Sequence, residues 1–149
     1  MIRLANSWLY EEHIVLVSFL PKDQKYLYDR VKVGCDNIEE LLLPQESPEK
    51  GLAEAERIAK LVDRTLCRRH PERDSHIVRI GDTWMVKDHV VGVNAMDKLA
   101  KIGGKPAVRV ACDNQDEVIF PCRTPEEALA EAEKLAVKVS LPPGGKKRK

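Results

Sequence analysis

The stretch Trp8–Val17, WLYEEHIVLV, returns at Trp84–Val93 as WMVKDHVVGV. Further along the chain, the tripeptide Cys35-Asp36-Asn37 is matched by Cys112-Asp113-Asn114. The spacing is 76 residues between the tryptophans (8 and 84) and 77 between the cysteines (35 and 112). Self-similarity at a nearly constant spacing is the signature of a repeated supersecondary unit. The sequence therefore predicts a tandem duplication.

Each copy contains several short β-prone runs followed by one helical segment. Alternating or β-branched residues, which favour strands, occupy 2–4, 8–10, 14–20, 31–35 and 40–44, and again 77–80, 83–86, 90–93, 107–112 and 117–121. We interpret each unit as an antiparallel meander of about four strands plus a helix, ββββα, made twice. This is an α+β fold, in which we expect the two copies to pack pseudo-symmetrically. The expected segments are a first repeat (1–69), a linker (70–76), a second repeat (77–141) and a basic flexible tail (142–149).

Two helices are predicted by their starts and by their apolar faces. Thr124 can cap one helix, with Pro125 in its first turn and Glu127 as the capping-box partner, and Ser47-Pro48 begins the other. Helical spacing predicts two buried faces: Leu52, Ala55, Ala59, Val62 and Leu66 in the first helix, and Leu129, Ala132, Ala136 and Val139 in the second.

Residues that recur in both copies have ordinary structural interpretations. The two Asp-Asn pairs favour hairpin turns, because short polar side chains bond to their own backbone and tolerate positive φ. Trp8 and Trp84 occupy matching positions, and we expect both to be core residues in matching environments rather than platforms for stacked bases.

Composition excludes several classes of protein. The 149 residues are 43% hydrophobic and 33% charged, with a net charge of +1, which is typical of a folded domain rather than a disordered chain. No apolar run approaches the roughly 20 residues of a membrane-spanning helix, so we expect no membrane association and a cytoplasmic location. Nothing in the chain calls for a cofactor. We expect the four cysteines to be reduced.

Histidine and cysteine recur but without the spacing of a reaction centre. His13 and His89 correspond, as do Cys35 and Cys112, yet the short paired spacing of a zinc site is absent. Cys122 lies near a helix start, where thiols can be activated, but a packing role is favoured. We therefore predict no metal and no catalytic residues, and a small enzyme with a Cys/His site is the third functional hypothesis.

Basic residues gather in corresponding loops of the two copies. The first loop contains four basic and two acidic residues, and the second contains four basic residues and one acidic residue. The net charge of the whole chain is only +1. Basic loops attract phosphate backbones, and tyrosines stack on unpaired bases. The first hypothesis is therefore a non-enzymatic protein that binds single-stranded DNA or RNA, through Lys22, Lys25, Tyr26, Tyr28, Arg30, Lys98, Lys101, Lys105, Arg109, Lys146, Lys147, Arg148 and Lys149.

A second hypothesis needs no nucleic acid. Two equivalent apolar surfaces would also suit a protein-interaction or assembly module, such as an adaptor, an inhibitor or a phage accessory protein, with a protein partner or as a homodimer. In its order of elements alone, four strands and a helix made twice, the chain is similar to PUR-repeat and Whirly-type nucleic-acid-binding proteins. No residue roles carry over from that resemblance, since a fold alone does not determine function.

Overall fold

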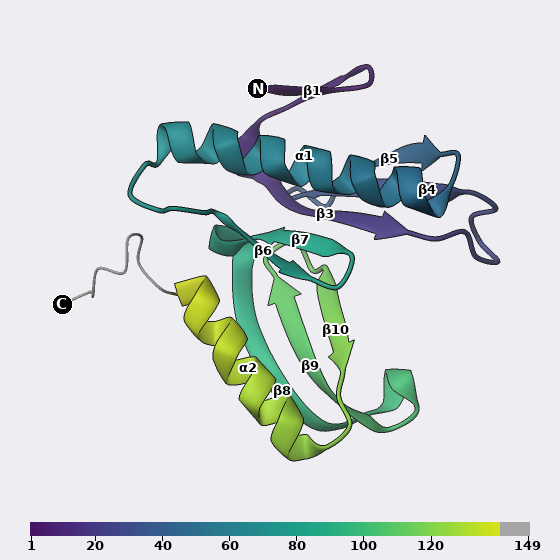
Figure 1. The fold of residues 1–149 in the computed structure, drawn as a ribbon, viewed down its shortest axis with the longest axis vertical. Coiled ribbons are helices and arrows are strands. Elements are labelled where there is room, and N and C mark those ends of the chain that lie inside the picture. Colours follow the sequence, from purple (N-terminus) through teal and green to yellow (C-terminus); the bar gives the residue numbers. More distant parts are fainter. Residues whose placement is uncertain (141–149) are drawn as a thin grey trace.

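The computed structural model describes residues 1–140 and has a mixed α+β fold in which all paired strands are antiparallel (Figure 1). The first half of the chain contains β1 (Ile2–Leu4), β2 (Ser7–Leu9), the 3-10 turn η1 (Glu11–His13), β3 (Ile14–Leu20), β4 (Asp29–Cys35), β5 (Glu40–Gln45) and α1 (Pro48–Arg69). The second half contains β6 (Ile77–Ile80), β7 (Thr83–Val86), η2 (Lys87–His89), β8 (Val90–Leu99), η3 (Ala100–Ile102), β9 (Lys105–Cys112), β10 (Glu117–Pro121) and α2 (Pro125–Ser140).

The α+β class is confirmed, and within residues 1–140 all five β-prone runs of each half form strands, one more than the expected meander of about four. The additional strand arises because the chain reverses after only a few residues at the start of each half. Ala5 (φ 53°) and Gly81 (φ 59°) adopt the left-handed conformation that such tight reversals need. Each half therefore begins with a small hairpin, β1–β2 in the first and β6–β7 in the second.

The division into sheets does not follow the division into halves. The strand orders are β5-β4-β3-β7-β6, β10-β9-β8 and β1-β2. The second hairpin therefore extends the sheet of the first half, through antiparallel pairing of β7 with β3. The first hairpin, β1–β2, pairs with no other strand among residues 1–140.

The helices begin where local capping predicts. The Ser47 hydroxyl accepts a hydrogen bond from the Lys50 amide, and the Thr124 hydroxyl accepts one from the Glu127 amide. The Glu127 carboxylate accepts a hydrogen bond from the Arg123 amide, one residue before the Thr124 amide that a capping box uses. No helix in the described part of the chain is long and apolar enough to cross a bilayer.

Two cores share the second hairpin. Trp84 and Val86 project into the first core, beneath α1, while Val78, Ile80 and Met85 project into the second, with α2. The first core also contains Ile2 and Leu4 of β1. The hairpin β6–β7 thus joins the two halves by presenting one face to each core.

The expected buried face of α2 is only partly correct. Ala132 is buried, but Leu129 and Ala136 are exposed, whereas Ala59, the counterpart of Ala136, is buried in α1. The reason is that α1 covers a five-stranded sheet, whereas α2 covers the three-stranded one.

Candidate functional site

The first basic loop, residues 21–28, uses its aromatic and guanidinium groups internally. The Arg30 guanidinium lies 4.0 Å from the centre of the Tyr26 ring, and it donates to the Pro21 carbonyl. Arg30 is only 5% exposed. Asp23 accepts from the amides of Lys25 and Tyr26, and these hydrogen bonds hold the pKa of its carboxyl below the usual value. Lys22, Lys25 and Tyr28 are the exposed members of the predicted set in this region.

The second basic loop is partly neutralised. Lys101 of η3 and Arg109 of β9 both donate to the Glu117 carboxylate on β10, and these bonds lower its pKa. Lys98 and Lys105 are exposed and form no ion pair with the residues described. The two loops belong to different sheets, and both project toward the right in Figure 1. The remaining predicted residues, Lys146–Lys149, lie outside the described part of the chain.

A feature that sequence reasoning missed is the junction at which the second hairpin joins the first sheet. Its register places Val17 opposite Trp84 and Ser18 opposite Thr83. The Phe19 amide donates to the Asp82 carbonyl at 2.9 Å, and the Ser18 and Thr83 hydroxyls lie 2.7 Å apart. A strand pairing between distant segments leaves no local sequence signal, although the β-branched run of β3 is consistent with burial on both faces.

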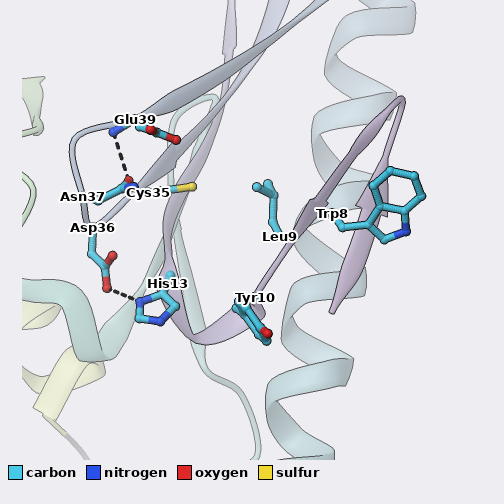
Figure 2. Close-up of a pocket in the computed structure, with 8 residues that line it drawn as sticks. All are labelled: Trp8, Leu9, Tyr10, His13, Cys35, Asp36, Asn37 and Glu39. Atoms are coloured by element: carbon cyan, nitrogen blue, oxygen red, sulfur yellow. Dashed lines mark hydrogen bonds and ion pairs between the residues drawn. The ribbon is translucent and has the colours of Figure 1, made fainter.

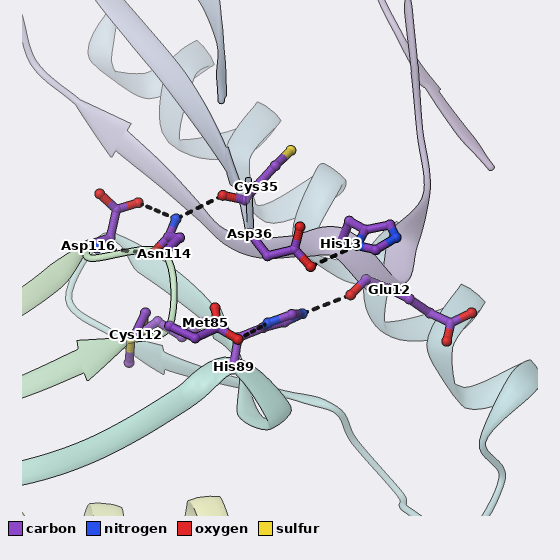
Figure 3. Close-up of polar contacts among 10 residues, drawn as sticks. Glu12, His13, Cys35, Asp36, Met85, His89, Cys112, Asn114 and Asp116 are labelled. Atoms are coloured by element: carbon purple, nitrogen blue, oxygen red, sulfur yellow. Dashed lines mark hydrogen bonds and ion pairs between the residues drawn. The ribbon is translucent and has the colours of Figure 1, made fainter. Parts of the chain in front are cut away.

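Polar contacts complete this junction (Figure 3). His89 bonds through Nδ1 to Asp113 and through Nε2 to the Glu12 carbonyl, at 2.7 Å and 2.8 Å. Both partners are acceptors only, so both ring nitrogens must carry a proton. Burial lowers the pKa of His89, but the bonds to Asp113 and Glu12 outweigh it and leave the pKa above its ordinary value. The Asn114 side-chain amide also donates to the Cys35 carbonyl.

The corresponding groups of the first hairpin are open to solvent. Trp8 is 57% exposed, whereas Trp84 is 5% exposed. Tyr10 is also exposed, although its counterpart Val86 is buried. The expectation that both tryptophans are core residues in matching environments is therefore wrong for Trp8. The physical reason is that β7 pairs with β3, whereas β2 pairs only with β1 in the part of the chain that the structure describes.

The open face of the first hairpin borders a shallow cavity of about 270 Å³ (Figure 2). Its lining residues come from β2, η1 and the β4–β5 turn: Trp8, Leu9, Tyr10, His13, Cys35, Asp36, Asn37 and Glu39. His13 bonds to Asp36 at 2.7 Å through Nδ1, as His89 bonds to Asp113. The cavity thus brings together the first-half counterparts of the residues that form the junction.

The cavity is poorly suited to nucleophilic chemistry. Burial raises the pKa of the Cys35 thiol, and the nearby carboxylates of Asp36 and Glu39 raise it further, so the reactive thiolate is disfavoured. Cys112 is buried as well, with a pKa raised to about 11. Within residues 1–140, no three His, Cys, Asp or Glu side chains are grouped closely enough to hold a metal ion. The four cysteines are unpaired thiols.

The acceptor strand of the junction is β3, to which β7 pairs, and its counterpart β8 is open. Every residue of β3 from Ile14 to Phe19 is buried, but β8 is the edge strand of its sheet and none of its residues is fully buried. Val91 is 66% exposed, whereas Val15 is fully buried. An unpaired edge presents free backbone donors and acceptors, which makes it a template for another strand.

Comparison of the chain with protein-family models, with curated proteins and with solved structures finds no significant match of any of the three kinds.

Proposed function

We propose that the protein is an interaction module that binds a protein partner by strand addition. The observation that carries the proposal is the contrast between the filled junction at β3 and the open edge at β8. Strand addition supplies main-chain hydrogen bonds for affinity and side-chain pockets for specificity. Exposed tryptophan and tyrosine are also the side chains that most often anchor protein interfaces.

The proposal includes a tandem duplication, which is supported by details of local geometry. Strand β3 pairs with β4 across a bulge at Ile14/Leu16, and β8 pairs with β9 across a bulge at Val90/Gly92. The turns after β4 and β9 each place one residue in the left-handed region, Ile38 (φ 73°) and Gln115 (φ 74°). Such shared irregularities are hard to explain by chance, because bulges and left-handed residues are local exceptions.

The direct test is recovery of the tagged full-length chain from its native cells, with and without nuclease. We expect a protein to copurify whether or not nuclease is present, and to be lost when Trp8 is replaced by lysine or Ala95 by proline. The variant Ala95→Thr, which keeps the backbone amide, is the matched control and should retain that protein. Loss of all copurifying protein after nuclease treatment would contradict the proposal.

A second candidate function, binding of single-stranded nucleic acid, is favoured by one observation. Lys22, Lys25, Lys98 and Lys105 are exposed, and none of them forms an ion pair with another residue in the range 1–140. For such binding, affinity should fall with the logarithm of salt concentration, with a slope of about −0.7 per neutralised phosphate. Replacing these four lysines by alanine should flatten that slope. Equal affinity of parent and variant at every salt concentration would exclude this function.

A further inference from the structure

We propose that a second copy of this chain, joined head to tail, occupies both open surfaces: the β1–β2 hairpin and the free edge of β8. The hairpin β1–β2 of one copy would add to β8 of the next, as β6–β7 adds to β3 within the chain. This inference rests on the proposed function, and it names the partner. Three sets of contacts support it.

The first set concerns the two hairpins, which are built alike. Arg3 pairs with Trp8 and Arg79 with Trp84, and in each pair the guanidinium lies over the indole ring, at 5.1 Å and 4.6 Å. One face of each hairpin packs into the core of its own half. The opposite face of β6–β7 enters the core of the other half through Trp84, whereas Trp8 on β1–β2 projects into solvent. The first hairpin is therefore the donor of a junction whose acceptor is missing from residues 1–140 of its own chain.

The second set concerns the acceptor strand. Phe19 pairs with Val31 on β4, and its amide donates across the other edge of β3, to Asp82. Ala95 pairs with Val108 on β9 in the same register, so its amide is directed toward the open edge of β8. The register of the filled junction then places Trp8 of one copy opposite Val93 of the next, and Ser7 opposite Asn94.

Helix α2 packs on β8, but a large apolar side chain of this helix stays exposed. Leu129 is 54% exposed, whereas its counterpart Leu52 packs against the first core. Burial of the indole beside the exposed side of α2 would give the association a hydrophobic contribution.

The third set concerns charge and hydrogen bonding. Lys32 bonds to Glu40 within its half and to Asp116 of the other half, at 3.4 Å and 3.1 Å. Arg109 and Glu39 are the counterparts of Lys32 and Asp116, and they keep the signs of charge. Arg109 bonds to Glu117 within its half and has the chemistry to bond to Glu39 of a second copy.

The hydrogen bonds of the junction also have counterparts that could form between two copies. His89 bonds to the Glu12 carbonyl, and Asn114 to the Cys35 carbonyl. By the same correspondence, His13 would donate to the Asp88 carbonyl of a second copy, and Asn37 to its Cys112 carbonyl. The cavity beside Trp8 is the place where these groups would meet their partners.

Such an association is heterologous, because the two surfaces in contact differ. A heterologous contact extends into an open chain of subunits unless its rotation happens to close a ring. The average mass of the wild-type protein should therefore rise continuously with concentration and should not stop at a dimer.

Two variants that each block one surface test the proposal. Trp8→Lys leaves β8 intact, and Ala95→Pro leaves the hairpin intact while removing one outward amide from an edge strand, where proline is tolerated. Measured by analytical ultracentrifugation up to about 1 mM, the range of weak association, each variant alone should be monomeric. An equimolar mixture should form a dimer with one junction. Ala95→Thr, which keeps the amide, should associate like the wild type.

Three results would overturn the inference: a wild-type chain that is monomeric throughout, a mixture that stays monomeric, or single variants that associate as strongly as the wild type. The proposed function would survive the first two if a different protein were still retained from native cells in a manner that depends on Trp8 and Ala95. Loss of that retention too would remove both proposals.

Discussion

Strands β3 and β8 are built from corresponding sequence but have opposite environments. β3 is buried on both faces because β7 lies along its free edge and the second half covers its outer face. β8 has β9 on one side and no strand on the other among residues 1–140. The burial of each of these two strands therefore depends on the neighbouring strand as well as on its own residues.

The largest expected effect separates the two tryptophans. Trp84→Ala should lower the free energy of unfolding by about 3–5 kcal/mol, because it empties a filled site in the first core. Trp8→Ala should change it by less than about 0.5 kcal/mol, because the ring is mostly exposed. Urea unfolding of dilute protein measures both. An equal loss of unfolding free energy in the two variants would show that Trp8 is a core residue.

The two halves also differ at the point where the helix meets the sheet. Gly51 of α1 lies against the Phe19 ring, which a Cβ at this position would overlap; the corresponding residues of the second half are Ala128 and Ala95. Gly51→Ala should therefore cost about 1–3 kcal/mol of overpacking, less the roughly 1 kcal/mol that alanine adds to helix stability.

The double variant Gly51→Ala/Phe19→Ala provides the control for this prediction. Removal of the ring should abolish the penalty of the alanine, leaving a strong coupling between the two sites in a double-mutant cycle. Additive losses would show that the ring does not limit position 51.

Helix ends and strand positions could be predicted from sequence, because capping and alternation are local. Ser47 and Thr124 cap the helices as expected. The exposure of Trp8 and Leu129 could not be predicted, because it depends on which distant strand lies beside each half. The acidic partner of Lys101 and Arg109 was also missed, because Glu117 reaches them only through the pairing of β9 with β10.

The filled junction should have its own pH dependence. The pKa of His89 is raised in the folded protein, so folding favours the protonated ring. Its contribution to stability is complete below the ordinary value of 6.5 and is lost as the pH rises through the raised pKa. In wild-type protein, the free energy of unfolding should therefore fall from pH 6 toward pH 8 more steeply than in His89→Gln. Parallel pH profiles of the two proteins would contradict this role.

A smaller effect is expected at the matching turns. Ile38 is a β-branched residue at φ 73°, a conformation that costs an L-residue about 1–2 kcal/mol. Ile38→Gly should raise the free energy of unfolding by about 0.5–1 kcal/mol, after allowance for the greater freedom of glycine in the unfolded chain. Gln115→Gly should behave similarly in thermal unfolding, and a loss of stability in either variant would rule out strain relief.

Amide hydrogen exchange compares the two acceptor strands, β3 and β8, within one protein. The Phe19 amide, which donates across the filled junction, should be protected at every protein concentration. The Ala95 amide should exchange rapidly in dilute protein and become protected as the concentration rises toward the millimolar range, where weak self-association is populated. An Ala95 amide that exchanges equally fast across this range would contradict head-to-tail association, as would protection of Ala95 in protein shown to be monomeric.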